Sequence, residues 1–217
     1  MFYRKLRQKE KTKSRLFLNW DKTELNKMKK LLILAFTALS FVATAQEFAP
    51  IDKSIMDLAY FPNGAHRAGF AKTPEEKGKL MPRIKVIYSR PLVNSRTVFG
   101  ELVKYDEAWR MGANESTEIT FYTPVMIGES VLAPGRYTLY CTPTANSWTL
   151  KVHPNLDGWG AYGYDESLDL ARVTAPVTKV DKNIEALSIT MYEASPNVVH
   201  LKVGWEKTVV EFPITLL

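Results

Sequence analysis

The sequence predicts an all-β protein: a single antiparallel β-sandwich or jelly-roll-like domain of about 8–10 strands, with one short N-terminal helix and two long loops. Three observations support this prediction. Short β-like stretches recur at spacings of roughly ten residues, which is typical of antiparallel sheets. No long helical period, internal repeat or linker divides them. The 217-residue chain is 46% hydrophobic and 12% aromatic, which is enough to form a core.

The expected strands are recognised by alternating apolar residues and by turn residues between them. Ile84, Val86 and Tyr88 alternate, and Gly128-Glu129 separates two short apolar runs, which predicts a hairpin whose turn opens with glycine. A second turn is expected at Pro134-Gly135. The expected strands are 84–88, 119–121, 125–127, 131–132, 136–141, 148–153, 171–180, 186–192, 198–205 and 208–215. The last three are joined by expected turns at 195–197 and at Glu206-Lys207.

The segment before these strands, 46–82, is expected to be irregular apart from one short helix. It contains a short apolar run at 55–61. Thr73-Pro74-Glu75-Glu76 has Thr at the N-cap, Pro at the first helical position and Glu at the third, which is a capping box. Met81-Pro82 must end the helix, because proline cannot continue it. The β-sandwich domain is then expected over 83–217.

Residues 28–45 have the three parts of a secretory signal peptide. Lys29 and Lys30 precede a twelve-residue apolar stretch at 31–42, and small residues precede an expected cleavage site between Ala45 and Gln46. Twelve residues rise only about 18 Å as a helix, short of a bilayer core of roughly 30 Å. The sequence therefore predicts an exported protein, periplasmic or extracellular, with no transmembrane segment after signal removal. Residues 1–27 are expected to be an upstream extension outside the fold, either a long n-region or the result of a start codon placed too far upstream.

The formal charge of +6 belongs to this leader. Residues 1–45 hold eleven Lys or Arg and three acidic residues, so the remaining chain carries a net charge of −2. A nucleic-acid-binding domain needs basic charge on its folded part, so this class of partner is excluded. Cys141 is the only cysteine, which excludes an internal disulfide and any site with several cysteine ligands. His66, His153 and His200 lie far apart, so we expect no metal, and the absence of a phosphate-binding loop or other cofactor motif predicts no cofactor.

The first long loop, 89–117, is rich in arginine. Arg90, Arg96 and Arg110, with Asn114 and Glu115, can form a cleft for a carboxylate, a phosphate or a sugar, because guanidinium groups bind anions through two hydrogen bonds. The alternative is that these arginines pair with acidic residues and tie the loop to the sandwich. The acidic residues available for such pairs are Glu101, Asp106, Glu107 and Glu115.

The second long loop, 154–169, carries Trp159, Tyr162 and Tyr164 with glycines between them. Rings flanked by glycine can present a face to a sugar, and Asp165, Glu166 and Asp169 can accept hydrogen bonds from its hydroxyl groups. The alternative is an aromatic plug over one open end of the sandwich. Asp165 with Asp157 or Asp169 is also a candidate carboxylate pair for glycoside hydrolysis.

Several motifs together resemble one known family. They are YSRP at 88–91, SRTVFGELV at 95–103, WRMGANEST at 109–117, APGRYTLY at 133–140, WGAYGY at 159–164 and the C-terminal GWEKTVVEFPI. In this order they resemble the secreted bacterial family catalogued as domain of unknown function 2911. The resemblance runs from about Leu58 to Leu216 and implies a single secreted domain with a mainly β fold. It implies no reaction and no ligand.

The function expected from these observations is a non-catalytic binding or accessory module for a small polar or saccharide ligand. Because a sandwich gathers its loops at two ends, Arg90, Arg110, Asn114 and Trp159 are expected to line one pocket between the two loops. Trp109 is expected to anchor the first loop against the sandwich. The alternatives are a hydrolase that uses acidic residues in the same cleft and a purely structural envelope protein. No catalytic residue or oligomeric state can be assigned.

Overall fold

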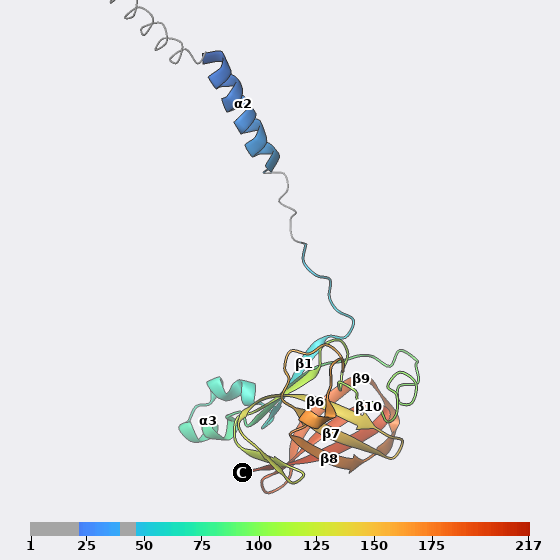
Figure 1. Ribbon diagram of the computed structural model, residues 1–217. Coiled ribbons are helices and arrows are strands. Elements are labelled where there is room, and N and C mark those ends of the chain that lie inside the picture. The colour runs from blue at the N-terminus through green and yellow to red at the C-terminus, as the bar shows by residue number, and fades with distance from the viewer. Residues whose placement is uncertain (1–21, 40–46) are drawn as a thin grey trace, which may run out of the picture. The chain divides into compact units, whose positions relative to one another are not determined.

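The computed structural model describes residues 22–39 and 47–217 (Figure 1). The chain divides into two units, Met1–Pro50 and Ile51–Leu217. In the first unit, helix α2 (Lys22–Leu39) contains part of the expected signal peptide and begins upstream of it. The expected cleavage site, and residues 1–21 of the expected extension, lie outside the described residues. In the described part of the chain, no helix is long and apolar enough to span a membrane.

The second unit is a β-sandwich of two antiparallel sheets, as the strand spacing predicts. The six-stranded sheet has the order β1 (Met56–Phe61), β2 (Ile84–Ser89), β3 (Thr117–Phe121), β6 (Gly135–Pro143), β7 (Ser147–His153) and β8 (Ala171–Pro176). The four-stranded sheet has the order β5 (Ser130–Leu132), β4 (Val125–Ile127), β10 (Val198–Leu216) and β9 (Thr178–Ser195). Neighbouring strands pair antiparallel throughout both sheets, and the expected hairpin joins β4 to β5.

The core lies between the inner faces of the two sheets. Strand alternation places Trp148, Leu150 and Val152 of β7 inside, where all are buried. A buried polar contact joins the two layers: the Tyr88 hydroxyl accepts a hydrogen bond from the Ile189 amide at 3.0 Å. A buried tyrosine usually needs such a partner for its hydroxyl group, which here couples β2 to β9.

Four aromatic rings meet in the centre of this core. Trp109 of the first loop stacks on Trp205 of β10 (centroids 6.0 Å apart, planes at 17°) and meets Trp148 and Phe99 edge-on at 5.7 and 5.9 Å. The Trp109 backbone also exchanges two hydrogen bonds with Cys141 of β6, each of 2.8 Å. The expectation that Trp109 anchors the first loop is confirmed by its burial in the core cluster.

The C-terminal strands differ from the expected ones. Instead of two strands with a turn at Glu206-Lys207, a single strand β10 runs through this dipeptide, and the pairing register with β9 shifts on both sides of Glu206. Glu206 has φ 56°, so the feature is a β-bulge. The expected strand 171–180 is in fact divided between β8 of one sheet and β9 of the other. The chain changes sheets at Val177, whose amide donates to the Asn146 carbonyl.

The N-terminal segment also differs from expectation, because the apolar run at 55–61 forms the edge strand β1 rather than an irregular segment. The short helix is confirmed as α3 (Pro74–Leu80), with the Thr73 side chain accepting from the Glu76 amide at 3.1 Å. The Glu76 carboxylate in turn accepts from the Lys72 amide. A 3₁₀ helix, η2 (Ala65–Phe70), connects β1 to α3 (Figure 1).

The outer face of the β9–β10 pair carries a titratable cluster that makes stability depend on pH. Glu211 binds Lys202 at 2.8 Å and also contacts Tyr192 and His200. These partners, Lys202 first, lower the pKa of Glu211 from its ordinary 4.5 to about 2. A lowered pKa in the folded state means that the stabilisation is complete above about pH 4.5 and is lost as the pH falls toward 2. We therefore expect wild type to exceed Glu211→Gln in free energy of unfolding at pH 7, with the difference shrinking at pH 3.

Denaturant titrations of both proteins at the two pH values test this expectation. Glu129→Gln is the matched control, because Glu129 is exposed and forms no hydrogen bond or ion pair with other described residues. A difference between wild type and Glu211→Gln that stays constant from pH 7 to pH 3 would contradict the expected role of Glu211.

Candidate functional site

The two long loops meet at one end of the sandwich. The Ser116 amide donates to the Gly158 carbonyl at 2.9 Å, and the Gly160 amide donates to the Asn114 carbonyl at 2.8 Å. Glu115 and Trp159 lie opposite each other in an antiparallel bridge. Asn114 adopts φ 59°, the left-handed conformation that asparagine tolerates, and so turns its carbonyl toward the second loop. The expected proximity of the loops is therefore present and rests on backbone pairing.

Arg90 ties strands together and is not among the lining residues of the cavity described below. Its Nη1 binds Asp57 of β1 at 2.9 Å, its Nε donates to the Leu187 carbonyl at 3.0 Å, and its Nη2 donates to Ser188 of β9. The guanidinium group thus joins the edge strand β1 of one sheet to β9 of the other. Arg90 therefore fits the alternative in which an arginine pairs with an acidic residue and ties the loop to the sandwich. Its partner is Asp57 of β1, not an acidic residue of the first loop.

Arg96 and Arg110 line one cavity of about 220 Å³ at the end of the sandwich, which we call the Arg110 cavity. Trp109 and Trp205, the stacked pair of the core, supply its apolar wall. The remaining lining residues are Ser54, Pro91, Leu102, Val103, Gly112 and Ala113. Two guanidinium groups beside an indole wall form a concave site with few polar groups, the usual form of a small-molecule site.

The two arginines of this cavity differ in how their donors are used. Arg96 donates to the carbonyls of Val93 and Leu92 at 2.9 and 2.5 Å, so part of its guanidinium group is occupied. The Arg110 guanidinium forms no hydrogen bond or ion pair with any described residue, and its Nε is fully buried. Burial lowers the pKa of Arg110 below its ordinary value, and Tyr162 partly offsets this shift. Arg110 therefore brings unused donors to the cavity.

The aromatic residues of the second loop do not line this cavity. Trp159 is 58% exposed and Tyr162 is 84% exposed. Tyr164 instead packs on the outer face of the six-stranded sheet, with ring centroids 4.8 Å from Tyr140 and 5.5 Å from His153. The Arg110 cavity therefore differs in its lining from the single pocket expected from the sequence. Of Arg90, Arg110, Asn114 and Trp159, only Arg110 is among the lining residues.

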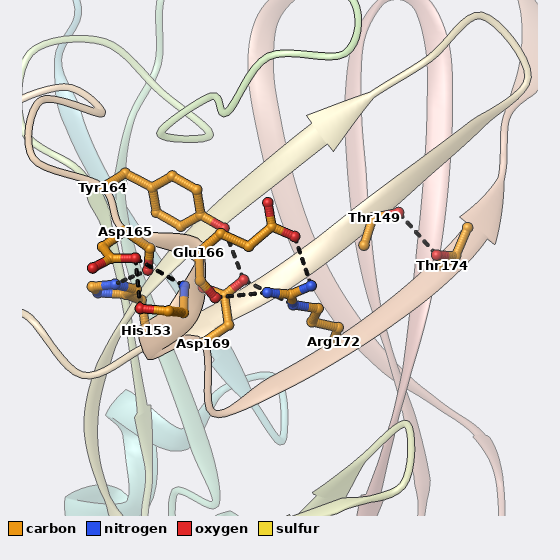
Figure 2. Close-up of polar contacts among 9 residues, drawn as sticks. Thr149, His153, Tyr164, Asp165, Glu166, Asp169, Arg172 and Thr174 are labelled. Atoms are coloured by element: carbon orange, nitrogen blue, oxygen red, sulfur yellow. Dashed lines mark hydrogen bonds and ion pairs between the residues drawn. The ribbon is translucent and has the colours of Figure 1, made fainter.

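Beside Tyr164, an ion-pair network anchors the second loop to β8, as Figure 2 shows. Asp169 accepts from the Tyr164 hydroxyl at 2.8 Å and from Arg172 Nε at 2.9 Å. Arg172 also binds Glu166 at 2.7 Å. Burial, followed by the hydrogen bond to Asp169, raises the pKa of the Tyr164 hydroxyl, which stays protonated. This arrangement favours the interpretation of Tyr164 as part of a loop anchor.

The carboxylates proposed for glycoside hydrolysis are engaged in local contacts. Asp165 accepts from the Ser167 amide and hydroxyl, which lower its pKa, and Asp157 pairs with Arg136 at 3.0 Å. The Asp169 carboxylate is fully buried against Tyr164 and Arg172. None of the three lines the Arg110 cavity. Burial also raises the pKa of the Cys141 thiol, which disfavours the reactive thiolate form.

Comparison with known proteins identifies the family. The model of a family described as "Protein of unknown function (DUF2911)" matches residues 73–214, well over half of the chain. The chain belongs to this family. No curated protein and no solved structure matches it. The DUF2911 match includes both long loops and every lining residue of the Arg110 cavity except Ser54.

One charged residue of the DUF2911 region was missed by the sequence reasoning. Because Trp148, Leu150 and Val152 face the core, Lys151 lies on the opposite face of β7, where a solvent-exposed side chain is expected. It is instead only 7% exposed, because the second loop folds back over this face. Alternation alone could have placed Lys151 on the outer face, but the path of the loop determines its burial.

Proposed function

We propose that this domain is an exported, non-catalytic binding module and that the Arg110 cavity holds a small polar ligand with an anionic group, a carboxylate or a phosphate. Export is supported by the pattern of residues 28–45. Binding is supported chiefly by the unpartnered Arg110 guanidinium in a cavity beside two tryptophans. Hydrogen bonds to charged groups are among the stronger ones, about 1.5–3 kcal/mol each.

The size and lining of the cavity restrict the ligand. A volume of about 220 Å³ lies below the roughly 300–1,000 Å³ typical of drug-sized ligand sites, so the ligand is compact. The indole rings of Trp109 and Trp205 suit its apolar or ring portion, and Arg96 and Arg110 suit its anionic group. The described lining residues include no acidic side chain, so this chemistry supports binding better than acid–base hydrolysis.

A thermal-shift titration of the purified protein tests this proposal, with acetate, lactate, succinate and inorganic phosphate as anionic probes and glucose as a neutral one. A ligand at a hundred times its Kd stabilises the native state by about 2.7 kcal/mol, which corresponds to a rise in Tm of about 5–10 °C for a domain of this size. We expect Arg110→Met to abolish this rise. We also expect Arg110→Met without ligand to be more stable than wild type by about 1 kcal/mol, because a buried, unpartnered donor is removed and the apolar stem is kept.

Arg83→Met is the matched control. Arg83 is exposed and does not line the cavity, so the ligand-induced rise should persist in this variant. The proposal fails if no anionic probe raises the Tm, or if Arg110→Met keeps the full rise. A loss of stability in unliganded Arg110→Met would indicate that Arg110 has a structural role instead.

A further inference from the structure

A second site lies around Lys151, on the outer face of the six-stranded sheet. In a sandwich this face is normally open to solvent, yet Lys151 is 93% buried, because its exposed fraction is 7%. Tyr164 of the second loop covers it, with its ring centroid 5.1 Å from the Lys151 ammonium nitrogen. A charged side chain is rarely so buried unless it has a partner.

The usual partner of such a lysine is missing. The Lys151 ammonium group forms no hydrogen bond or ion pair with the described residues, and it lies over the ring of Tyr164. In the strand register, Lys151 lies directly opposite Arg172 of β8, a second cation on the same face. Like charges in this position repel, but Glu166 and Asp169 compensate only Arg172 (Figure 2). Lys151 is left without an anion.

The space beside Lys151 has the size and chemistry of a ligand site. It is a hollow of about 560 Å³, which we call the Lys151 hollow. Thr142 and Thr149, opposite each other on β6 and β7, contribute hydroxyl groups, and Asp106 and Glu166 contribute carboxylates. Ala108, Tyr164 and Arg172 complete the lining. The Lys151 hollow and the Arg110 cavity share no lining residue.

We propose that the Lys151 hollow binds a sugar acid, a polyhydroxy ligand with one carboxylate. The carboxylate pairs with Lys151, and the ligand hydroxyls bind Thr142 and Thr149 as well as the carboxylates of Asp106 and Glu166. The two acidic residues make a phosphate dianion a poor occupant, because it would be repelled by both and has no hydroxyl donors to offer them. A sugar acid satisfies both the cation and the acceptors of the lining.

Isothermal titration calorimetry of the purified protein with glucuronate and with glucose tests this inference. The two probes share their ring and differ in the carboxylate. We expect saturable binding of glucuronate and at least about tenfold weaker binding of glucose, the effect of losing one charge-assisted hydrogen bond. Lys151→Met should weaken glucuronate binding by a similar factor. Lys85→Met is the matched control, because Lys85 lies on the outer face of the same sheet in β2, with β3 and β6 between it and β7.

A second measurement needs no variant and so avoids any folding defect. Amine acetylation of the wild-type protein, followed by peptide mass spectrometry, should show that glucuronate slows the modification of Lys151 and leaves that of Lys85 unchanged. Failure of glucuronate to bind overturns the proposal. So does binding that survives in Lys151→Met and disappears in Arg110→Met, because the sugar acid would then occupy the Arg110 cavity.

Discussion

Trp109→Ala is expected to lower the free energy of unfolding by about 3–5 kcal/mol, the range for deleting a buried aromatic side chain. Trp109 is only 6% exposed and stacks on Trp205, while its indole Nε1 donates to the Gly112 carbonyl at 3.2 Å. Alanine would leave a void at the meeting point of the first loop, β6 and β10. The first loop would lose its main apolar attachment to the sandwich.

Urea denaturation followed by circular dichroism measures this effect. Trp159→Ala is the matched control, since it removes the same side chain from a position that is 58% exposed. We expect the control to change stability by no more than about 0.5 kcal/mol. Equal effects of the two substitutions would show that Trp109 does not anchor the loop in solution.

Gly128→Ala is expected to destabilise the protein by about 2–5 kcal/mol, through backbone strain and overpacking together. Gly128 has φ 58° at the turn between β4 and β5. A Cβ atom there would lie 2.3 Å from the carbonyl oxygen of Arg172 in β8, a backbone atom that cannot move aside easily. The glycine therefore allows the β4–β5 hairpin of one sheet to approach the edge strand of the other.

Gly163→Ala separates the two contributions. Gly163 has φ 74°, but nothing lies within 4 Å of a Cβ placed there, so this variant has the conformational cost of about 1–2 kcal/mol without the clash. Gly78→Ala adds a second control in helix α3, where we expect a gain of about 0.5–1 kcal/mol. The same urea denaturation assay measures all three variants. If Gly128→Ala lowered the free energy of unfolding no more than Gly163→Ala does, the close approach of the hairpin to β8 would be contradicted.

The local elements could be predicted because each depends on residues close together in the chain. Thr73 caps α3 as its capping box indicates, since the donor and acceptor are three residues apart. Gly128-Glu129 forms the hairpin turn because only a few residues decide its geometry. The alternation of Ile84, Val86 and Tyr88 likewise placed one face of β2 in the core. The β-sandwich fold class could be predicted because short strand and turn patterns of this kind recur along the chain.

The candidate sites could be predicted only in part. The sequence identifies the arginine-rich loop and the aromatic loop, and both contribute to the described cavities. It could not distinguish Arg90, which binds Asp57 thirty-three residues earlier, from Arg110, whose guanidinium has no partner among the described residues. Whether a guanidinium group pairs within the protein or is free to bind a ligand depends on which strands pass beside it. That is a long-range property of the fold.

The sequence by itself therefore determined the capped helix, the β4–β5 hairpin, the antiparallel sandwich class and the two loops that carry the candidate sites, because these follow from local spacing and turn chemistry. Its motifs also indicated the family. Tertiary structure decided that β10 continues through a bulge at Glu206, that β1 pairs along the sheet edge, and that the second loop buries Lys151. The physical reason is common to all three. Each depends on a neighbour that is distant in the chain and supplies the hydrogen bonds or covers the side chain, and no local pattern encodes that neighbour's position.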